Sequence, residues 1–302
     1  MSSHRVLLLE GARHLAIDTG RLVIRSQEGE TCVLPADVAV LVIDHPAVTI
    51  TAAALKALAS AGCVILITDD KHLPLAETLP RGARGRTGRR LRQQLVLEQS
   101  PISARLWREI VFARIRGEAA VLRSTGRNGA LYLERLADKV GSGDVSNYEA
   151  QAARHYWKHL WPDGFRRTKQ GADDGINARL NYGYAVLRSL IARSLVAAGL
   201  TTVVGIGHHS EENPFNLADD FIEPYRFLVE QHVVESLEAQ PDAEFDARAR
   251  AAVAACVTRE VKLNTQVFRV PAAVERTVES FVQVLESSRP ASLTLAVPEC
   301  LA

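Results

Sequence analysis

The chain has 302 residues and carries 36 Lys and Arg against 35 Asp and Glu, a formal net charge of +1. This near-neutral total argues against a uniformly basic nucleic-acid coat, an acidic tail and a disordered polyelectrolyte. Apolar residues make up 47% and charged residues 24%, which is typical of a globular protein that buries a core. The length predicts one large or two medium domains.

The sequence argues against a membrane-spanning protein and against a disulfide-bonded one. No stretch approaches 18 uncharged apolar residues, and only four apolar residues separate Arg5 from Glu10, too few for the core of a signal peptide. The four cysteines are scattered and form no C-x-x-C pair, so we expect neither a disulfide framework nor a zinc knuckle. The expected setting is a reducing cytoplasm, without membrane association.

Residues 1–80 are predicted to form a small β-rich domain. Strand-sized runs rich in branched residues fall at 5–9, 14–18, 22–25, 31–34 and 39–43, with Gly-containing turns between the early ones. One helix is predicted over 51–61, with Thr51 as its cap and Gly62 closing it. This helix leads into a further predicted strand over 63–68.

A strongly basic segment is hidden in the neutral total. Residues 81–127 carry 12 basic and 3 acidic side chains, net +9, whereas residues 1–80 sum to −3 and residues 128–302 to −5. We interpret the head of this segment, residues 81–92, as a basic linker. Its six arginines match phosphate oxygens and its glycines free the backbone, which suits a loop on a nucleic-acid backbone. A solvated interdomain linker explains the same composition equally well.

Residues 93–302 are predicted to form a larger all-α domain. In the clearest helix, 174–198, seven residues from Ile176 to Ala198 recur at spacings of three and four and define one buried stripe. The other predicted helices cover 91–125, 131–140, 148–160, 217–239, 245–262 and 272–286. The predicted fold class is therefore α+β, with a small β-rich N-terminal domain followed by a larger all-α C-terminal catalytic domain.

The densest group of potential metal ligands lies in residues 205–226. Glycines bracket a loop that carries His208 and His209, and a predicted helix then offers Asp220 and Glu223. These two acids are three residues apart, so they project from nearly the same helix face. An imidazole facing a carboxylate pair can form a divalent-metal site, and a mixed oxygen and nitrogen set suits manganese or magnesium better than a structural zinc.

Structural roles explain parts of this group as well. Asn216 can be an N-cap with Asp219 in the first turn, and a single histidine is more often structural than a ligand. Pro224 favours function, because it removes a backbone hydrogen bond and kinks the helix directly after Glu223. A magnesium or manganese site needs a further acid. Glu149 is the candidate, although a first-turn acid can also serve only the helix dipole.

Four motifs match a known family. They are Glu149-Ala150-x-x-Ala153-Arg154-x-Tyr156-Trp157, then Asp174-x-Ile176-Asn177-Ala178-x-Leu180-Asn181-Tyr182-Gly183-Tyr184, then Gly205-x-x-His208, and Asp220-Phe221-Ile222-Glu223-Pro224-Tyr225-Arg226. Together they resemble the CRISPR adaptation integrase, the catalytic one of the two universal CRISPR spacer-acquisition proteins. The resemblance covers essentially the whole chain. The stretch 208–218 looks most like the version that accompanies type II systems.

The resemblance implies a metal-dependent DNA endonuclease and integrase. Such an enzyme inserts short DNA fragments as new spacers into a CRISPR array, by attack of a 3′-hydroxyl on a phosphodiester. It implies that Glu149, His208 and Glu223 hold the catalytic Mg²⁺ or Mn²⁺, and that Asp220 is a further catalytic acid close to the metal or its water. His209 is the alternative ligand if the loop register differs by one.

Supporting residues follow from the same resemblance and from the charge pattern. Asn177 and Asn181 lie on a helix expected behind the site, where they could orient ligands, while Leu180 and Tyr184 are expected in the core. The candidate phosphate contacts are Arg84, Arg86, Arg89, Arg90, Arg92, Arg166 and Arg167. Each of these arginines can equally be ordinary surface charge.

The resemblance also implies partners. They are double-stranded DNA, as spacer precursor and CRISPR repeat, a second copy of the chain joined through the front domain, a small ferredoxin-like adaptation protein, and an RNA-guided effector nuclease. Two alternatives come from other functional classes. One is a DNA-binding scaffold that has lost catalysis, and the other is a metal-dependent hydrolase of small molecules.

Overall fold

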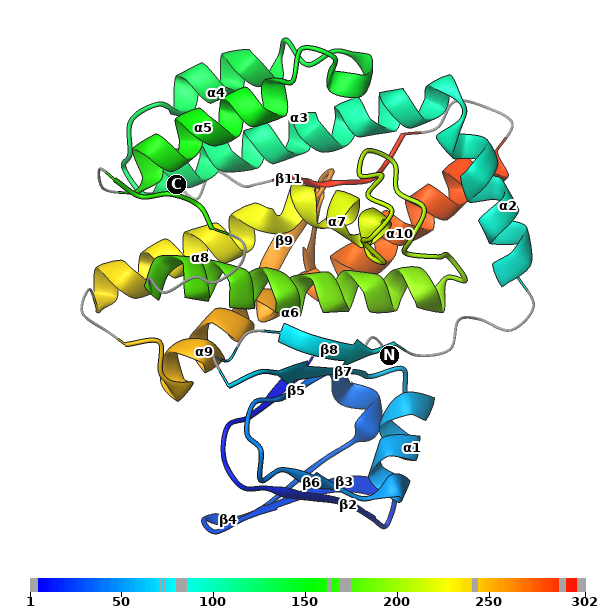
Figure 1. Cartoon of the computed structure of the whole chain (residues 1–302), viewed down its shortest axis with the longest axis vertical. Helices are drawn as coiled ribbons and strands as arrows, with labels where there is room; N and C mark the ends of the chain where they lie inside the picture. The colour runs from blue at the N-terminus through cyan, green and yellow to red at the C-terminus, as the bar shows by residue number, and fades with distance from the viewer. Residues whose placement is uncertain are drawn as a thin grey trace.

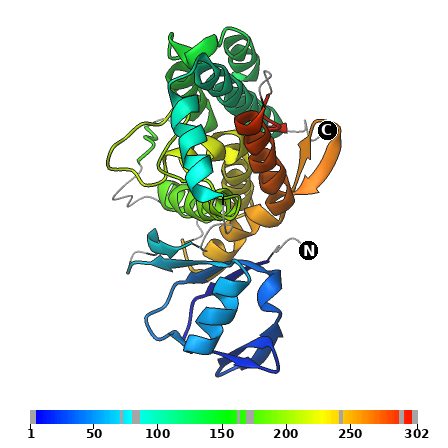
Figure 2. The same cartoon turned by 90° about the vertical axis from the view of Figure 1, so that its right-hand side faces the viewer.

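The chain divides into a β-rich unit and a larger helical unit (Figure 1). The computed structural model describes residues 5–70, 72, 74–79, 86–161, 164–168, 175–240, 244–287 and 292–297. Figure 2 shows the same division from the side, with the β-rich unit below the helices. No helix in these ranges is both long enough and apolar enough to cross a membrane.

Two four-stranded sheets build the β-rich unit. The first has the order β1 (Arg5–Leu9), β5 (Val38–Ile43), β7 (Val64–Thr68) and β8 (Pro74–Thr78). Strands β1, β5 and β7 are parallel to one another, and β8 is antiparallel to β7. The second has the order β4 (Gly29–Val33), β3 (Arg21–Ser26), β2 (His14–Asp18) and β6 (Thr49–Ile50). Helix α1 (Ala52–Ser60) begins where Thr51 accepts a hydrogen bond from the Ala54 N–H, which confirms the predicted cap.

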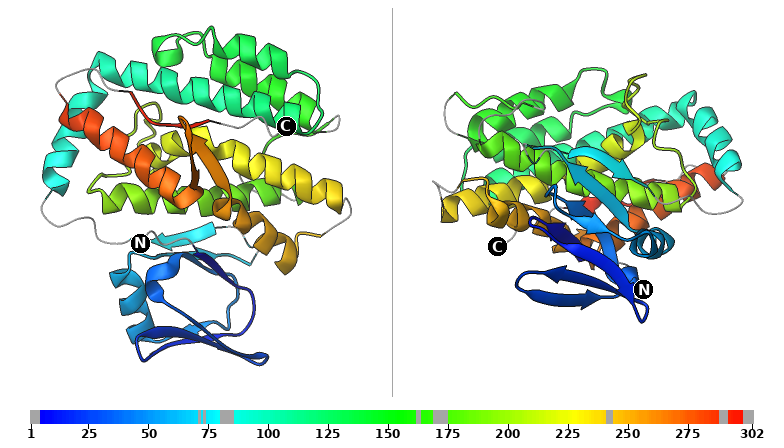
Figure 3. Two further views of the ribbon diagram at one scale, coloured as in Figure 1. Left: turned by 180° about the vertical axis from the view of Figure 1, so that it is seen from behind. Right: turned by 60° about the horizontal axis from the view of Figure 1, so that its bottom comes forward.

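The central strand β5 is buried on both faces. Val38 and Leu41 belong to the core inside the β-rich unit, whereas Val40 and Val42 belong to the core of the helical unit. A strand covered on both sides has a continuous apolar sequence instead of an alternating one, which accounts for its run of Val, Ala and Leu. Figure 3 shows β8, the edge strand of this sheet, next to the helices, and β5, β7 and β8 all contact α6 (Gly175–Ala197).

Helix α6 runs through the middle of the helical unit. It contacts α7 (Asn216–Ile222), α8 (Arg226–Ala239), α9 (Ala247–Ala254) and α10 (Val270–Glu286). The N-terminal part of the unit contains α2 (Thr87–Glu98), α3 (Pro101–Ser124), α4 (Ala130–Ala137) and α5 (Tyr148–Leu160). The fold class, α+β with β-sheets first and a mostly helical region after them, is confirmed.

Two predicted helices are wrong in extent. The single helix expected over 91–125 is two helices, because Pro101 has no N–H to continue a helix and instead opens α3 behind the cap Ser100. Helix α2 begins at Thr87, so residues 87–92 of the expected linker are helical. The helix expected over 245–262 ends at Ala254, and a 3-10 turn (Ala255–Thr258) follows it.

The C-terminal unit is not entirely α-helical. Strands β9 (Glu260–Leu263), β10 (Gln266–Arg269) and β11 (Ala296–Val297) form a sheet in the order β10-β9-β11. Between β9 and β10 the backbone turns at Asn264, which has φ 54°. Alternating apolar residues around an Asn turn are typical of a hairpin, so this part of the sheet was legible in the sequence.

A buried ion pair joins the two units. On α9, Arg250 Nε lies 2.6 Å from Asp44 Oδ2 and 3.2 Å from Glu10 Oε1. The other oxygen of Asp44 accepts hydrogen bonds from Thr68 and from His72 Nδ1. Asp44 is 5% exposed, so its charge depends on these partners.

We expect Arg250→Ala to destabilise the protein by about 3 kcal/mol, because it leaves the buried carboxylate of Asp44 without its cation. Urea denaturation followed by circular dichroism measures this change. Arg248→Ala, at an exposed position on the same helix, should change the free energy of unfolding by less than about 0.5 kcal/mol. Equal effects of the two substitutions would show that the ion pair does not stabilise the fold.

Candidate active site

The carboxylate of Asp220 organises the loop that carries His208. Asp220 Oδ1 accepts hydrogen bonds from the backbone N–H of His208 at 3.0 Å and of Gly207 at 3.2 Å, and Oδ2 accepts one from Ile206. The imidazole Nδ1 of His208 lies 2.8 Å from the same Oδ1. The loop folds closely around Asp220, since a Cβ at Gly205 would lie 2.9 Å from Asp220 Oδ2 and would overlap the carbonyl oxygen of His208.

This arrangement fixes the side of the imidazole that is free. Because Nδ1 faces a carboxylate, it carries the proton, and Nε2 keeps the lone pair that a metal needs. The hydrogen bond to Asp220 also raises the pKa of His208, although burial acts in the opposite direction. Asp220 was expected beside the metal or its water. Its oxygens accept hydrogen bonds from the loop amides and contact the imidazole, so Asp220 holds the loop that carries His208.

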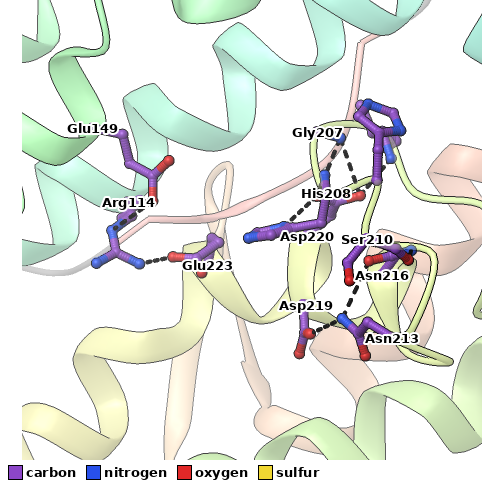
Figure 4. Close-up of polar contacts among 12 residues, drawn as sticks. Arg114, Glu149, Gly207, His208, Ser210, Asn213, Asn216, Asp219, Asp220 and Glu223 are labelled. Atoms are coloured by element: carbon purple, nitrogen blue, oxygen red, sulfur yellow. Dashed lines mark hydrogen bonds and ion pairs between the residues drawn. The ribbon is translucent and has the colours of Figure 1, made fainter. Parts of the chain in front are cut away.

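The neighbouring residues have structural partners. His209 Nδ1 lies 3.4 Å from Glu98 on α2, whereas His208 Nδ1 lies 2.8 Å from Asp220. Asp219 accepts a hydrogen bond from Asn213 Nδ2 at 2.7 Å (Figure 4). The predicted cap Asn216 does not cap α7, because Phe215 occupies that position and the Asn216 side chain donates to loop carbonyls.

A guanidinium joins the other two predicted ligands. Arg114 on α3 makes a close ion pair with Glu223 Oε2, and its Nε lies 3.9 Å from Glu149 Oε1. In Figure 4, Arg114 lies between the two carboxylates, and the pair of His208 and Asp220 lies on the other side of Glu223. The predicted site residues therefore come from α5, the loop before α7, α7 and the turn after α7.

The donor chemistry fits a hard divalent cation. Two carboxylates and one imidazole nitrogen are ligands that magnesium and manganese accept, and Glu223 Oε2 is buried beside the Arg114 guanidinium. Across the described ranges, no three His, Cys, Asp or Glu side chains are already gathered around one ion position. A cation bound by Glu223 would have to compete with Arg114 for that carboxylate.

Behind Glu223 lies a buried polar network that the sequence analysis missed. Glu230 accepts hydrogen bonds from Tyr156 at 2.7 Å and from Tyr184 at 2.6 Å. Arg226 lies 3.5 Å from Glu230 and 3.4 Å from Glu223, with its guanidinium 4.2 Å from the centre of the Tyr184 ring. Glu223, Arg226 and Glu230 are spaced by three and four residues, and this spacing indicates paired charges on one helix face. The sequence did not predict that these charged side chains are buried.

With this geometry in view, comparison with known proteins identifies the family. The family model for CRISPR associated protein Cas1 matches residues 6–261. The chain belongs to the Cas1 family. It is 37% identical over 280 residues to the CRISPR-associated endonuclease Cas1 of Neisseria meningitidis serogroup C (strain 8013), covering 92% of this chain and 90% of that protein. Cas1 proteins act in CRISPR adaptation as endonucleases and integrases, and they are generally metal-dependent.

Two solved structures share the fold. A casposase bound to an integration product has a TM-score of 0.82 and 20% identity, with 99% of this chain and 95% of that chain covered. A Cas6-RT-Cas1–Cas2 complex has a TM-score of 0.75 and 20% identity, with 97% of this chain and 36% of that longer chain covered. The Cas1 fold is thus present over nearly the whole length.

In this Cas1 protein the α6 asparagines hold a loop, not the ligands. Asn177 donates to the Arg166 carbonyl at 2.8 Å and accepts from the Thr168 N–H at 2.9 Å. The guanidinium of Arg167 donates to Asn177 at 2.9 Å and to Asn181 at 2.6 Å. The expectation that both asparagines orient ligands is therefore replaced by a role in shaping residues 166–168. Leu180 and Tyr184 are buried, as expected.

The arginines expected on DNA separate into distinct groups. Arg86, Arg89, Arg92 and Arg166 are exposed, and Arg167 is half-buried against α6. Arg90 is only 3% exposed, and its Nη2 lies 2.8 Å from Glu286 on α10. It therefore links two helices and is not accessible to a DNA phosphate. Arg84 lies outside the described residues.

We expect the stability of the protein to fall between pH 4.5 and 7 because of Glu118. Burial raises the pKa of Glu118 from its ordinary value near 4.5 to about 7, although Arg114 opposes the shift. The folded chain then keeps a proton that the unfolded chain releases, so rising pH favours unfolding across this window. Glu118→Gln should remove this loss, which is on the order of 3 kcal/mol at about 1.4 kcal/mol per pKa unit.

Urea denaturation at pH 5, 6 and 7.5 measures the effect. Relative to the wild type, Glu118→Gln should become more stable as the pH rises, whereas Glu211→Gln, at an exposed position, should follow the wild-type profile. Parallel profiles for Glu118→Gln and the wild type would contradict the assignment.

Proposed function

We propose that Glu149, His208 and Glu223 hold Mg²⁺ or Mn²⁺, and that this site joins the 3′ ends of short DNA fragments to a CRISPR repeat. The observation that carries the proposal is the fixed orientation of His208 by Asp220 beside the carboxylates of Glu223 and Glu149. A divalent cation held there would polarise the target phosphate and lower the pKa of the attacking 3′-hydroxyl. With water as the nucleophile, the same site would cleave DNA.

The chain's own residues hold the ligands in place. Asp220 keeps Nδ1 of His208 protonated, so that Nε2 faces the site. Arg226 approaches the Glu223 carboxylate from α8 and Arg114 approaches it from α3. Two guanidiniums therefore lie beside the one buried carboxylate of Glu223 and offset its charge.

DNA is the proposed substrate, as spacer precursor and as CRISPR repeat. The casposase relative was solved on an integration product and the longer relative in a complex with Cas2, which supports DNA and a small ferredoxin-like adaptation protein as partners. We also propose that the chain forms a homodimer through the β-rich unit. We further propose that it is the type II version of the family and that an RNA-guided effector nuclease is another partner. The support for these is the sequence resemblance, with stretch 208–218 carrying the subtype.

The competing functions have less support. A scaffold without catalysis would not need Glu149, His208 and Glu223, and all three are present with His208 oriented. A hydrolase of small molecules is disfavoured because the family is one of DNA endonucleases. The reducing, cytoplasmic setting stays a prediction, and the three cysteines in the described ranges, Cys32, Cys63 and Cys256, are free thiols.

Joining of a short DNA duplex to a repeat target in the presence of Mn²⁺ tests the metal assignment. Glu223→Gln and His208→Ala should each lower the rate at least about 100-fold, because each removes a ligand. Glu212→Gln, at an exposed position on the same loop, should keep the wild-type rate. Undiminished joining by either ligand variant would rule out the assignment.

The salt dependence of DNA binding tests the phosphate contacts. A triple variant in which Arg86, Arg89 and Arg92 are Gln should lower the slope of log K against log salt by about 2 to 3, since each phosphate contact contributes about 0.9. Filter binding between 50 and 200 mM salt is the measurement. A matched triple variant of exposed arginines elsewhere, Arg21, Arg248 and Arg269, should change the slope little. An unchanged slope in the first variant would remove α2 from the DNA-binding surface.

A further inference from the structure

The indole of Trp107 packs on the His208 loop. Trp107 lies on α3, and its ring meets the His208 imidazole edge to face, with centroids 5.6 Å apart and planes at 82°. A Cβ at Gly207 would overlap the Cδ2 and Cε3 atoms of the same indole. Only a glycine therefore lets the backbone at position 207 approach the ring this closely. The contact involves both the backbone before the ligand and the ligand itself.

The same loop is held from its carbonyl side by α2 and α3. Ser103 on α3 donates to the Ile206 carbonyl at 3.0 Å, and Gln94 on α2 donates to the Thr201 carbonyl at 3.0 Å. Asp220 holds the amide side, as described above. With the backbone fixed from both sides, the His208 side chain is held by Asp220 at Nδ1 and by Trp107 packing against its ring.

Helix α3 therefore contacts both halves of the site. Ser103, Trp107, Arg114 and Glu118 follow one another at spacings of four, seven and four, which places them on one face of the helix. Trp107 meets the histidine loop, and Arg114 meets Glu223 and Glu149. One rigid element thus sets the separation between the imidazole and the carboxylates, and a metal with fixed ligand distances is sensitive to that separation.

We propose that Trp107 is a positioning residue, which holds the His208 imidazole in the orientation that ligates the metal. This rests on the proposed function, because it presumes that His208 is a ligand. Trp107 acts through His208 and Gly207, without contributing a ligand atom of its own. An outer residue that fixes a ligating imidazole typically changes metal affinity by about 10- to 100-fold when it is removed.

The first test compares Trp107→Leu, Trp107→Phe and Phe112→Leu. Phe112 is the matched control, because it lies on the opposite face of α3, where it lines a cavity of about 650 Å³. Mn²⁺ affinity is measured by electron paramagnetic resonance of the free ion, and joining kinetics give kcat and KM for DNA. Trp107→Leu should weaken Mn²⁺ binding about tenfold or more and lower kcat with little change in KM for DNA. Trp107→Phe should restore most of the affinity, and Phe112→Leu should match the wild type.

The second test uses the steric fit between the ring and the backbone. Gly207→Ala alone should weaken Mn²⁺ binding at least as much as Trp107→Leu, because the new methyl group displaces the indole. In the Trp107→Leu background, Gly207→Ala should cause little further loss, since the ring it would displace is gone. Melting temperatures of all variants report folding separately from metal binding.

The outcomes separate this inference from the proposed function. Wild-type affinity for Mn²⁺ in folded Trp107→Leu, or fully additive losses in the double variant, would overturn the positioning role and leave the metal assignment intact. A wild-type protein that binds no Mn²⁺ would overturn the proposed function and the positioning role together.

Discussion

The structure depends on pairing charges that are buried in the middle of the helical unit. Glu118, Glu223 and Glu230 are each at most 5% exposed, and an unpaired carboxylate at such depth would cost several kcal/mol. Arg114 from α3 and Arg226 from α8 supply the cations. Because each guanidinium contacts carboxylates on more than one element, these ion pairs link the helices to one another. The same arrangement brings Glu223 to the site.

The helix break at Pro224 gives the two acids, Asp220 and Glu223, different partners. Asp220 lies in α7, where its carboxylate turns to the loop, and Glu223 opens the 3-10 turn (Glu223–Tyr225), where its carboxylate turns to Arg114. A spacing of three in a regular helix would direct both acids to one partner. In this chain one acid orients the imidazole and the other remains available as a ligand. A helix-breaking residue is therefore part of how the site is built.

The β-rich unit is joined to the helical unit through apolar packing and one buried ion pair. Strand β5 contributes to both cores, and Arg250 of α9 reaches Asp44 at the end of the sheet. On the other side of the site, α2 follows the basic connector and holds the histidine loop through Gln94. Helix α2, which is proposed to contact DNA, is thus hydrogen-bonded to the loop that carries His208. Under the proposed function, DNA bound along α2 would contact a helix that also holds the histidine loop.

The sequence by itself predicted the β-rich first part, the mostly helical second part, the α+β class and the candidate ligands, because apolar periodicity, caps and short motifs are local properties of the chain. It also exposed the proline that breaks the helix at Pro224. It did not reveal the break before Pro101, the roles of Arg114 and Arg226, or the burial of Arg90, which removes that arginine from the DNA-binding set. Only the tertiary structure decided the burial of these side chains and the pairing of Arg114 with Glu223 and of Arg90 with Glu286, because both depend on how distant helices pack together. The motif likewise predicted Asp220 close to the metal or its water, and the structure adds that its carboxylate contacts both the amide and the imidazole of His208.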